Sequence, residues 1–111
     1  MDDNELEKEI QSKGLTAPRI TPDVIDAQIV SVYYLNVAEA VEIVHGKSDD
    51  SLRVLTLCIL VLRNGFTVIG ESACASPENF DPEIGRKLAY ENARNKIWLL
   101  EGYRLKSELS K

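Results

Sequence analysis

An Asn64-Gly65 pair lies between two β-type segments, and this arrangement constrains the fold more than any other part of the sequence. Residues 52–63 are apolar at both alternating positions, and residues 66–69 resume the β-type pattern after the pair. Asn-Gly between such segments is the strongest short-range signal for a β-hairpin, because a type I′ turn needs positive φ at both central residues. We therefore predict a hairpin in which Asn64 and Gly65 are the two loop residues.

This two-residue loop fixes a register, and the register predicts the state of the two cysteines. Cys58 would pair with Glu71 and Cys74 with Leu55, so the two sulfurs would point to opposite faces of the sheet. Gly70 is the one position at which a bulge could change this alternation. We predict two free thiols, with Cys58 acting as a small buried hydrophobe.

A short helix is predicted before the hairpin, over residues 22–31. Thr21-Pro22 supplies a typical N-cap residue followed by proline at the first helical position. The segment that follows is ambiguous. Residues 32–35 favour a strand, whereas residues 38–44 can form a short helix with Asn36 as its cap.

A long helix is predicted after the hairpin, over residues 82–101, because Asp81-Pro82 repeats the same start signal. Small residues recur along it at four-residue spacing and would let it approach a sheet closely: Gly85, Ala89 and Ala93. We expect Asn92, beside this stripe, to hydrogen-bond the hairpin. Gly102 is expected to end the helix, and residues 104–111 to form a second short helix or a frayed end.

These elements predict an α+β domain over residues 20–111. Its centre is a small antiparallel sheet built on the hairpin, with the long C-terminal helix packed on one face and a short N-terminal helix beside it. Because residues 52–62 are apolar at both parities, the strand needs a second cover, either the 22–31 helix or another subunit. Residues 1–19 are acidic and predict a flexible tail; the alternative is a short amphipathic helix for partner binding or self-association.

The charge of the chain limits its partners. The formal net charge is -5, and the acidity is concentrated before Phe80. Direct nucleic-acid binding and binding to an anionic membrane are therefore disfavoured. Residues 1–11 contain no apolar signal-peptide region, and the longest apolar run, 54–62, is too short to span a bilayer. We expect a cytosolic protein that does not engage a membrane.

The sequence offers little catalytic chemistry. His45 is the single histidine and lies in a polar loop, so a multi-histidine metal site is impossible. Cys74 lies near Glu71, whose negative charge disfavours a thiolate. No nucleophile–base pair is visible. We therefore predict that the chain is not an enzyme and uses no metal and no cofactor.

Two segments could bind a ligand. Arg86, Tyr90 and Arg94 recur at four-residue spacing on one helix face, where two guanidinium groups beside an aromatic ring could hold a phosphate. Stacking partners would come from nearby aromatic side chains, Phe80 and Trp98. The alternative is an exposed face with local ion pairs. Residues 70–80, rich in small and hydroxyl side chains, form either a tight connector or a binding loop.

The hairpin and helix residues together resemble a known family. The matching residues are 55–68, 70–74, 79–81 and a series of positions in the C-terminal helix from Ile84 to Tyr103. This pattern is similar to small tailed-phage and prophage proteins known by phage gene names as gene product 49 or gene 66. The resemblance spans about residues 20–106, and residues 36–50 depart from it in length and composition.

The resemblance implies a phage or prophage accessory protein in the host bacterial cytoplasm, and it carries over no catalytic residue. We expect a non-enzymatic protein that binds a host or phage protein, in a host-takeover or counter-defence role. A core this small would also gain stability from homo-oligomerisation. The alternative is a binder that sequesters a nucleotide defence signal, using the five residues Phe80, Arg86, Tyr90, Arg94 and Trp98.

Overall fold

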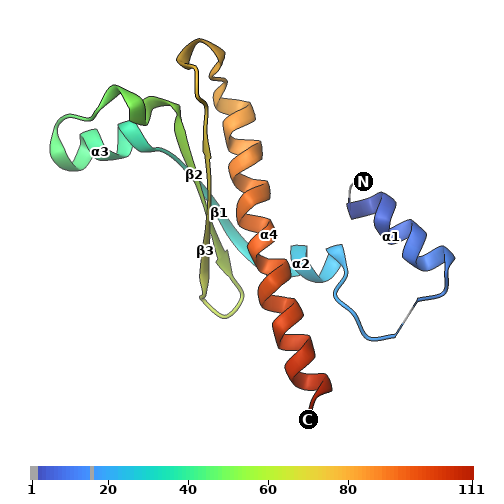
Figure 1. The fold of residues 1–111 in the computed structure, drawn as a ribbon. Helices are drawn as coiled ribbons and strands as arrows, with labels where there is room; N and C mark the ends of the chain where they lie inside the picture. The colour runs from blue at the N-terminus through green and yellow to red at the C-terminus, as the bar shows by residue number, and fades with distance from the viewer. Residues whose placement is uncertain (1–2, 16) are drawn as a thin grey trace.

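In the computed structural model, which describes residues 3–15 and 17–111, a three-stranded antiparallel sheet lies against one long helix (Figure 1). The strand order is β1-β2-β3. The elements run in the order α1 (Asp3–Ser12), α2 (Pro22–Gln28), β1 (Ile29–Asn36), α3 (Val37–His45), η1 (Asp50–Val54), β2 (Leu55–Leu62), β3 (Thr67–Ala73), η2 (Pro77–Asn79) and α4 (Pro82–Leu109), where η marks a 3₁₀ helix. The predicted α+β fold class is confirmed.

The hairpin is present, but its predicted register is wrong by one residue. The Leu62 amide donates to the Phe66 carbonyl at 2.8 Å, and the Gly65 amide donates back to the Leu62 carbonyl at 2.9 Å. The loop therefore contains three residues, Arg63 to Gly65. Within this loop only Gly65 has a positive φ, of 86°, and no non-glycine residue of the described chain has one, so the type I′ turn is excluded. The Asn64 side chain instead accepts a hydrogen bond from the Phe66 amide at 2.9 Å.

The corrected register moves the cysteines. Cys58 pairs with Gly70 rather than Glu71, and the Cys74 amide bonds to the Val54 carbonyl beyond the last strand pair. Cys58 and Cys74 thus occupy positions on the same face of the hairpin. They lie four strand positions apart, a distance of roughly 13 Å along the strand. Both are free thiols, as predicted, although the geometric reason was different.

The ambiguous segment resolves into both predicted elements. Residues 29–36 form β1, which pairs with β2. Helix α3 begins directly after β1. Asn36 caps α3, since its side chain accepts from the Glu39 amide at 3.2 Å. The preceding helix begins at its predicted cap, Thr21, but ends at Gln28, because the chain there enters the strand pairing with β2.

The C-terminal helix is longer than predicted. Asp81 caps α4 as expected, and its side chain accepts from two amides of the first turn. The helix then continues through Gly102 to Leu109, so the prediction that Gly102 ends it is wrong. Arg104 pairs with Glu101 and with Glu108, and these ion pairs join successive turns on both sides of the glycine. Tyr103 does not pack back and is 77% exposed.

The core lies between α4 and one face of β2 and β3. Its buried members include Cys58, Leu60, Val68, Ile97 and, from α2, Ile25. The small-residue stripe of α4 meets the sheet, as predicted: Gly85, Ala89 and Ala93 are all buried. Gly70 serves this contact and not a bulge, because a Cβ there would collide with α4 backbone.

Side chains of α4 also reach the outer edge of β3. The Asn92 amide group donates to the Glu71 carbonyl at 2.8 Å, which confirms the predicted bond between the helix and the hairpin. The Lys96 ammonium donates to the Ile69 carbonyl. Two carbonyls that an edge strand would otherwise leave free are thereby satisfied.

The acidic N-terminal segment contains a helix, the alternative considered to a flexible tail. Glu7 of α1 accepts two hydrogen bonds from the Arg19 guanidinium, and one of these bonds is 2.8 Å long. Asp3 forms an ion pair with Arg94 of α4. Among the described residues, no helix is long and apolar enough to cross a membrane.

Candidate functional site

The five residues predicted to bind a nucleotide do not converge on one hollow. Tyr90 and Arg94 line a hollow beside α2 and β1, while Phe80 and Arg86 line a separate one near the start of α4. Trp98 lines a third hollow beneath α1. They lie along one helix, but its length spreads their side chains over three surfaces.

Arg94 is already engaged by carboxylates. Its Nε donates to Asp26 at 2.9 Å, and one terminal nitrogen pairs with Asp3. The Arg94 side chain is only 15% exposed. Asp23 and Glu91 also line this hollow, so its walls carry more negative than positive charge and favour an anion poorly.

Arg86 keeps its charge available. It is exposed, and no ion pair of Arg86 is present in the part of the chain that the structure describes. With Phe80 and Tyr34 it lines a hollow of about 230 Å³. Glu39 lines the same hollow, and burial raises the pKa of the Tyr34 hydroxyl.

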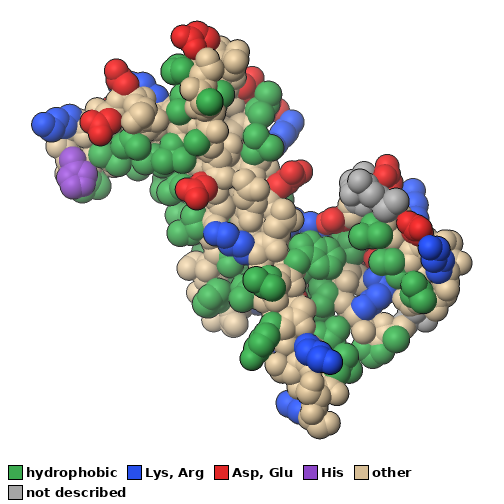
Figure 2. Space-filling model, viewed as in Figure 1, with side chains coloured by type: hydrophobic (Ala, Val, Ile, Leu, Met, Phe, Trp, Pro, Cys, Tyr) green, Lys and Arg blue, Asp and Glu red, His purple; other side chains and the backbone are tan. Residues whose placement is uncertain are grey.

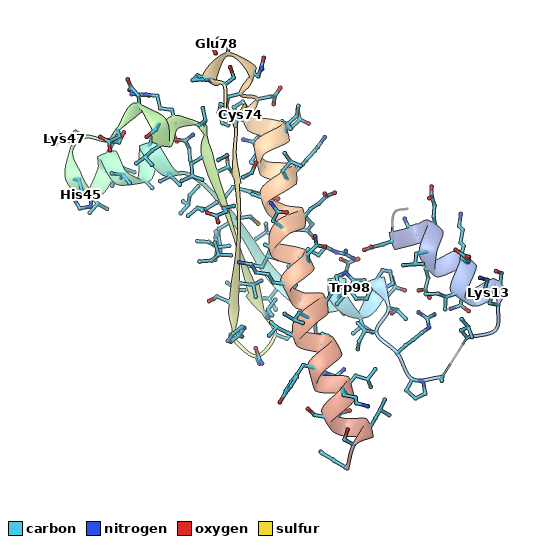
Figure 3. All side chains as sticks on the ribbon, in the orientation of Figure 1. Lys13, His45, Lys47, Cys74, Glu78 and Trp98 are labelled. Atoms are coloured by element: carbon cyan, nitrogen blue, oxygen red, sulfur yellow. The ribbon has the colours of Figure 1, made fainter. Side chains whose placement is uncertain are left out.

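Trp98 has a structural contact rather than an open face. It is half-buried and points from α4 toward α2 and α1 (Figure 3). Leu6 and Ile10 of α1 line the same small hollow. The predicted stacking residue therefore serves as the surface on which the N-terminal helix packs.

The residues with nucleophilic or metal-binding chemistry remain apart. His45 lies at the end of α3 that is turned away from the sheet, well apart from Cys74, which lies at the open end of the hairpin (Figure 3). Burial raises the pKa of the Cys58 thiol, which keeps it protonated. Among the described residues no group of three His, Cys, Asp or Glu could hold a metal ion.

A groove absent from the sequence predictions lies where α4 extends past the hairpin loop. We call it the C-terminal groove; it measures about 490 Å³ and is lined by Gln28, Leu62, Arg63, Asn64, Phe66, Ile97, Leu100, Glu101 and Arg104. Leu99 and Tyr103, each 77% exposed, lie on the same length of helix. No sequence signal indicated the groove, because it forms between residues far apart in the chain, from Gln28 to Arg104, whose approach depends on the tertiary fold.

A second surface is the face of the sheet turned away from α4, which we call the open sheet face. Its members follow from the strand pairing: Ser31, Tyr33, Leu35, Leu55, Leu57, Ile59, Val61, Thr67, Ile69, Glu71 and Ala73. The apolar pattern of residues 52–62 did indicate this face. The 22–31 helix does not cover it, because α2 packs against α4 and contributes Ile25 to the core on the other side.

Comparison with known proteins gives one match. The sequence model of the Phage protein (N4 Gp49/phage Sf6 gene 66) family matches residues 20–109, which is the whole chain from the start of the α2 region to the end of α4. No curated protein and no solved structure matches the chain. The family resemblance carried by the hairpin and the C-terminal helix is confirmed, and the chain belongs to the N4 Gp49/phage Sf6 gene 66 family of phage proteins.

Proposed function

We propose that this chain is a non-enzymatic phage accessory protein that acts by binding a protein of the phage or of its bacterial host. The observation that carries this proposal is the C-terminal groove, a concave, largely apolar surface bordered by an aromatic ring and two arginines. Aromatic and arginine side chains are the types most enriched where protein–protein binding energy is concentrated.

The groove also indicates the chemistry of the partner. Arg63 and Arg104 line it against the single carboxylate of Glu101, in a chain whose net charge is -5. Arg104 is held by Glu101 and Glu108, whereas no ion pair of Arg63 is present among the described residues. A partner segment that suits this groove would be apolar and would place a carboxylate near Arg63.

Affinity capture from phage-infected cells tests the proposal. The tagged chain should retain one protein in a stoichiometric amount. Leu100→Glu, which places a charge inside the groove, should lose that protein, and Arg63→Glu should weaken its binding at least tenfold. Leu88→Glu is the matched control, because Leu88 is an exposed apolar residue of the same helix outside the groove. Retention by Leu100→Glu, or the absence of any stoichiometric protein, would overturn the proposal.

The nucleotide alternative has narrower support. It depends on Arg86, whose free charge lies beside Phe80 and Tyr34. Titration calorimetry of the purified chain with a panel of mono- and dinucleotides tests it directly. Nucleotide binding that Arg86→Glu abolishes and Arg94→Glu leaves intact would favour the alternative. The absence of binding heat with every nucleotide in the panel would exclude nucleotide sequestration.

A further inference from the structure

The open sheet face is an extended apolar surface that α4 and α2, which pack on the other side of the sheet, leave uncovered. Tyr33 is 58% exposed and Ile69 is 45% exposed, on either side of Ile59 in the central strand. Hydrophobic side chains gather along α3 and continue down the adjoining margin of the sheet (Figure 2). The exposed apolar residues of α3 are Ile43 and Val44. Contiguous patches of this kind mark interaction sites in soluble proteins.

The chain exposes more surface than a compact monomer of the same mass would. The accessible surface is 7895 Å², whereas a folded monomer of this mass exposes about 6,100 Å². The radius of gyration is 17.4 Å, against about 13 Å for a compact chain of this length. The excess, roughly 1,800 Å² for one chain, is about twice the roughly 800 Å² that each partner contributes to a standard protein–protein interface.

The chain's own N-terminal helix is not the missing cover. Glu7 of α1 is bound to Arg19, and Asp3 is bound to Arg94 on α4. Its apolar residues Leu6 and Ile10 line a hollow with Trp98, also on α4. The described part of α1 therefore packs beside α4, on the other side of the sheet from this face.

We propose that the open sheet face binds the same face of a second copy of this chain, forming a symmetric dimer. Charge favours this occupant. The chain is acidic overall, yet Glu71 is the only charged residue that the described strands place on this face. Two copies can therefore approach through it without the like-charge repulsion that their other surfaces would create. A two-fold axis makes one apolar face complementary to itself and closes the assembly at two subunits.

Light scattering coupled to size-exclusion chromatography, on the purified full-length chain, tests the dimer. The wild type should have twice the 12.4 kDa chain mass. Ile69→Glu and Tyr33→Glu should each give the monomer mass, because a carboxylate is costly to bury in a dry interface. Leu99→Glu, on the exposed C-terminal length of α4, should remain dimeric and serves as the matched control.

A second variant separates loss of docking from loss of folding. Ile69→Thr keeps a β-branched side chain suited to a strand but removes apolar surface. It should retain the wild-type circular dichroism and raise the dimer dissociation constant at least tenfold. A wild type that stays monomeric at all concentrations, an assembly larger than two, or a dimer that none of these face variants weakens would overturn the proposal. Because this test uses only the purified chain, its result is independent of the partner proposed for the C-terminal groove.

Discussion

Gly70 of β3 lies directly against the backbone of Ala93 in α4. A Cβ atom built on Gly70 would lie 2.8 Å from the Ala93 Cα and closer still to its amide nitrogen. The neighbouring atoms belong to the main chain, so no side-chain rotation could relieve the contact. This glycine therefore fixes how closely the helix approaches the sheet, and with it the depth of the core.

Replacing Gly70 with alanine should be strongly destabilising. The added methyl group forces α4 away from β3 along the stripe that includes Ala89 and Ala93, an overpacking cost of about 2–3 kcal/mol. Urea denaturation at matched protein concentration would measure the change in the free energy of unfolding. A loss below about 0.5 kcal/mol would mean that the helix does not pack this closely in solution.

The same substitution at Gly102 should have the opposite sign. Gly102 lies inside α4, and a Cβ there would meet no atom within 4 Å. Alanine should therefore stabilise the chain by about 0.5–1 kcal/mol, because it removes the conformational entropy that glycine loses in a helix. Urea denaturation checks this too. A decrease in stability would indicate that the helix ends at Gly102 in solution.

The contrast between these two glycines shows what the sequence could and could not predict. Asn64-Gly65, the two Asx/Thr-Pro helix starts and the small-residue stripe are local signals, and each produced the element it indicated. The exact register depends on whether Asn64 takes a positive φ, which the Asn-Gly pattern favours but does not require. The structure has a three-residue loop, and every pair downstream of it moved by one position.

The surfaces were harder to predict than the elements. α4 continues past Gly102, with Arg104 paired to Glu101 across that glycine, and the glycine signal alone did not predict this continuation or the position of Arg104 in the C-terminal groove. Helical periodicity did place Arg86, Tyr90 and Arg94 on one face. It could not reveal that Asp26, far away in sequence, binds Arg94.

The two cysteines should differ in reactivity. Cys58 is fully buried, and burial raises its pKa, whereas Cys74 is partly exposed. A thiol reagent should therefore modify one thiol per native chain and both in denaturant, with Cys58 at least tenfold slower. Cys74→Ser should abolish the native reaction. Fast modification of Cys58 in that variant would show that the core opens readily.

Acid should release α1 from the rest of the chain. The hydrogen bond from Arg19 lowers the pKa of Glu7 from 4.5 to about 2. Since the folded pKa is depressed, this contact contributes its full stability above about pH 4.5, and the contribution is lost as the pH falls toward 2. A helix of ten residues is marginal by itself, so α1 depends on such contacts.

Trp98 gives this transition a specific signal, because it is the single tryptophan and lines the hollow beneath α1. Its emission should shift to the red between pH 4.5 and 2 as water reaches the ring. Glu7→Gln, which lacks the titrating carboxylate, should already show red-shifted emission at pH 7 with a flat response through that range. Far-UV circular dichroism recorded in parallel should lose only a small helical component, which separates release of α1 from unfolding of the sheet. Emission that stays constant to pH 2 in the wild type, together with unchanged emission of Glu7→Gln at pH 7, would show that the Glu7–Arg19 contact does not hold the helix in place.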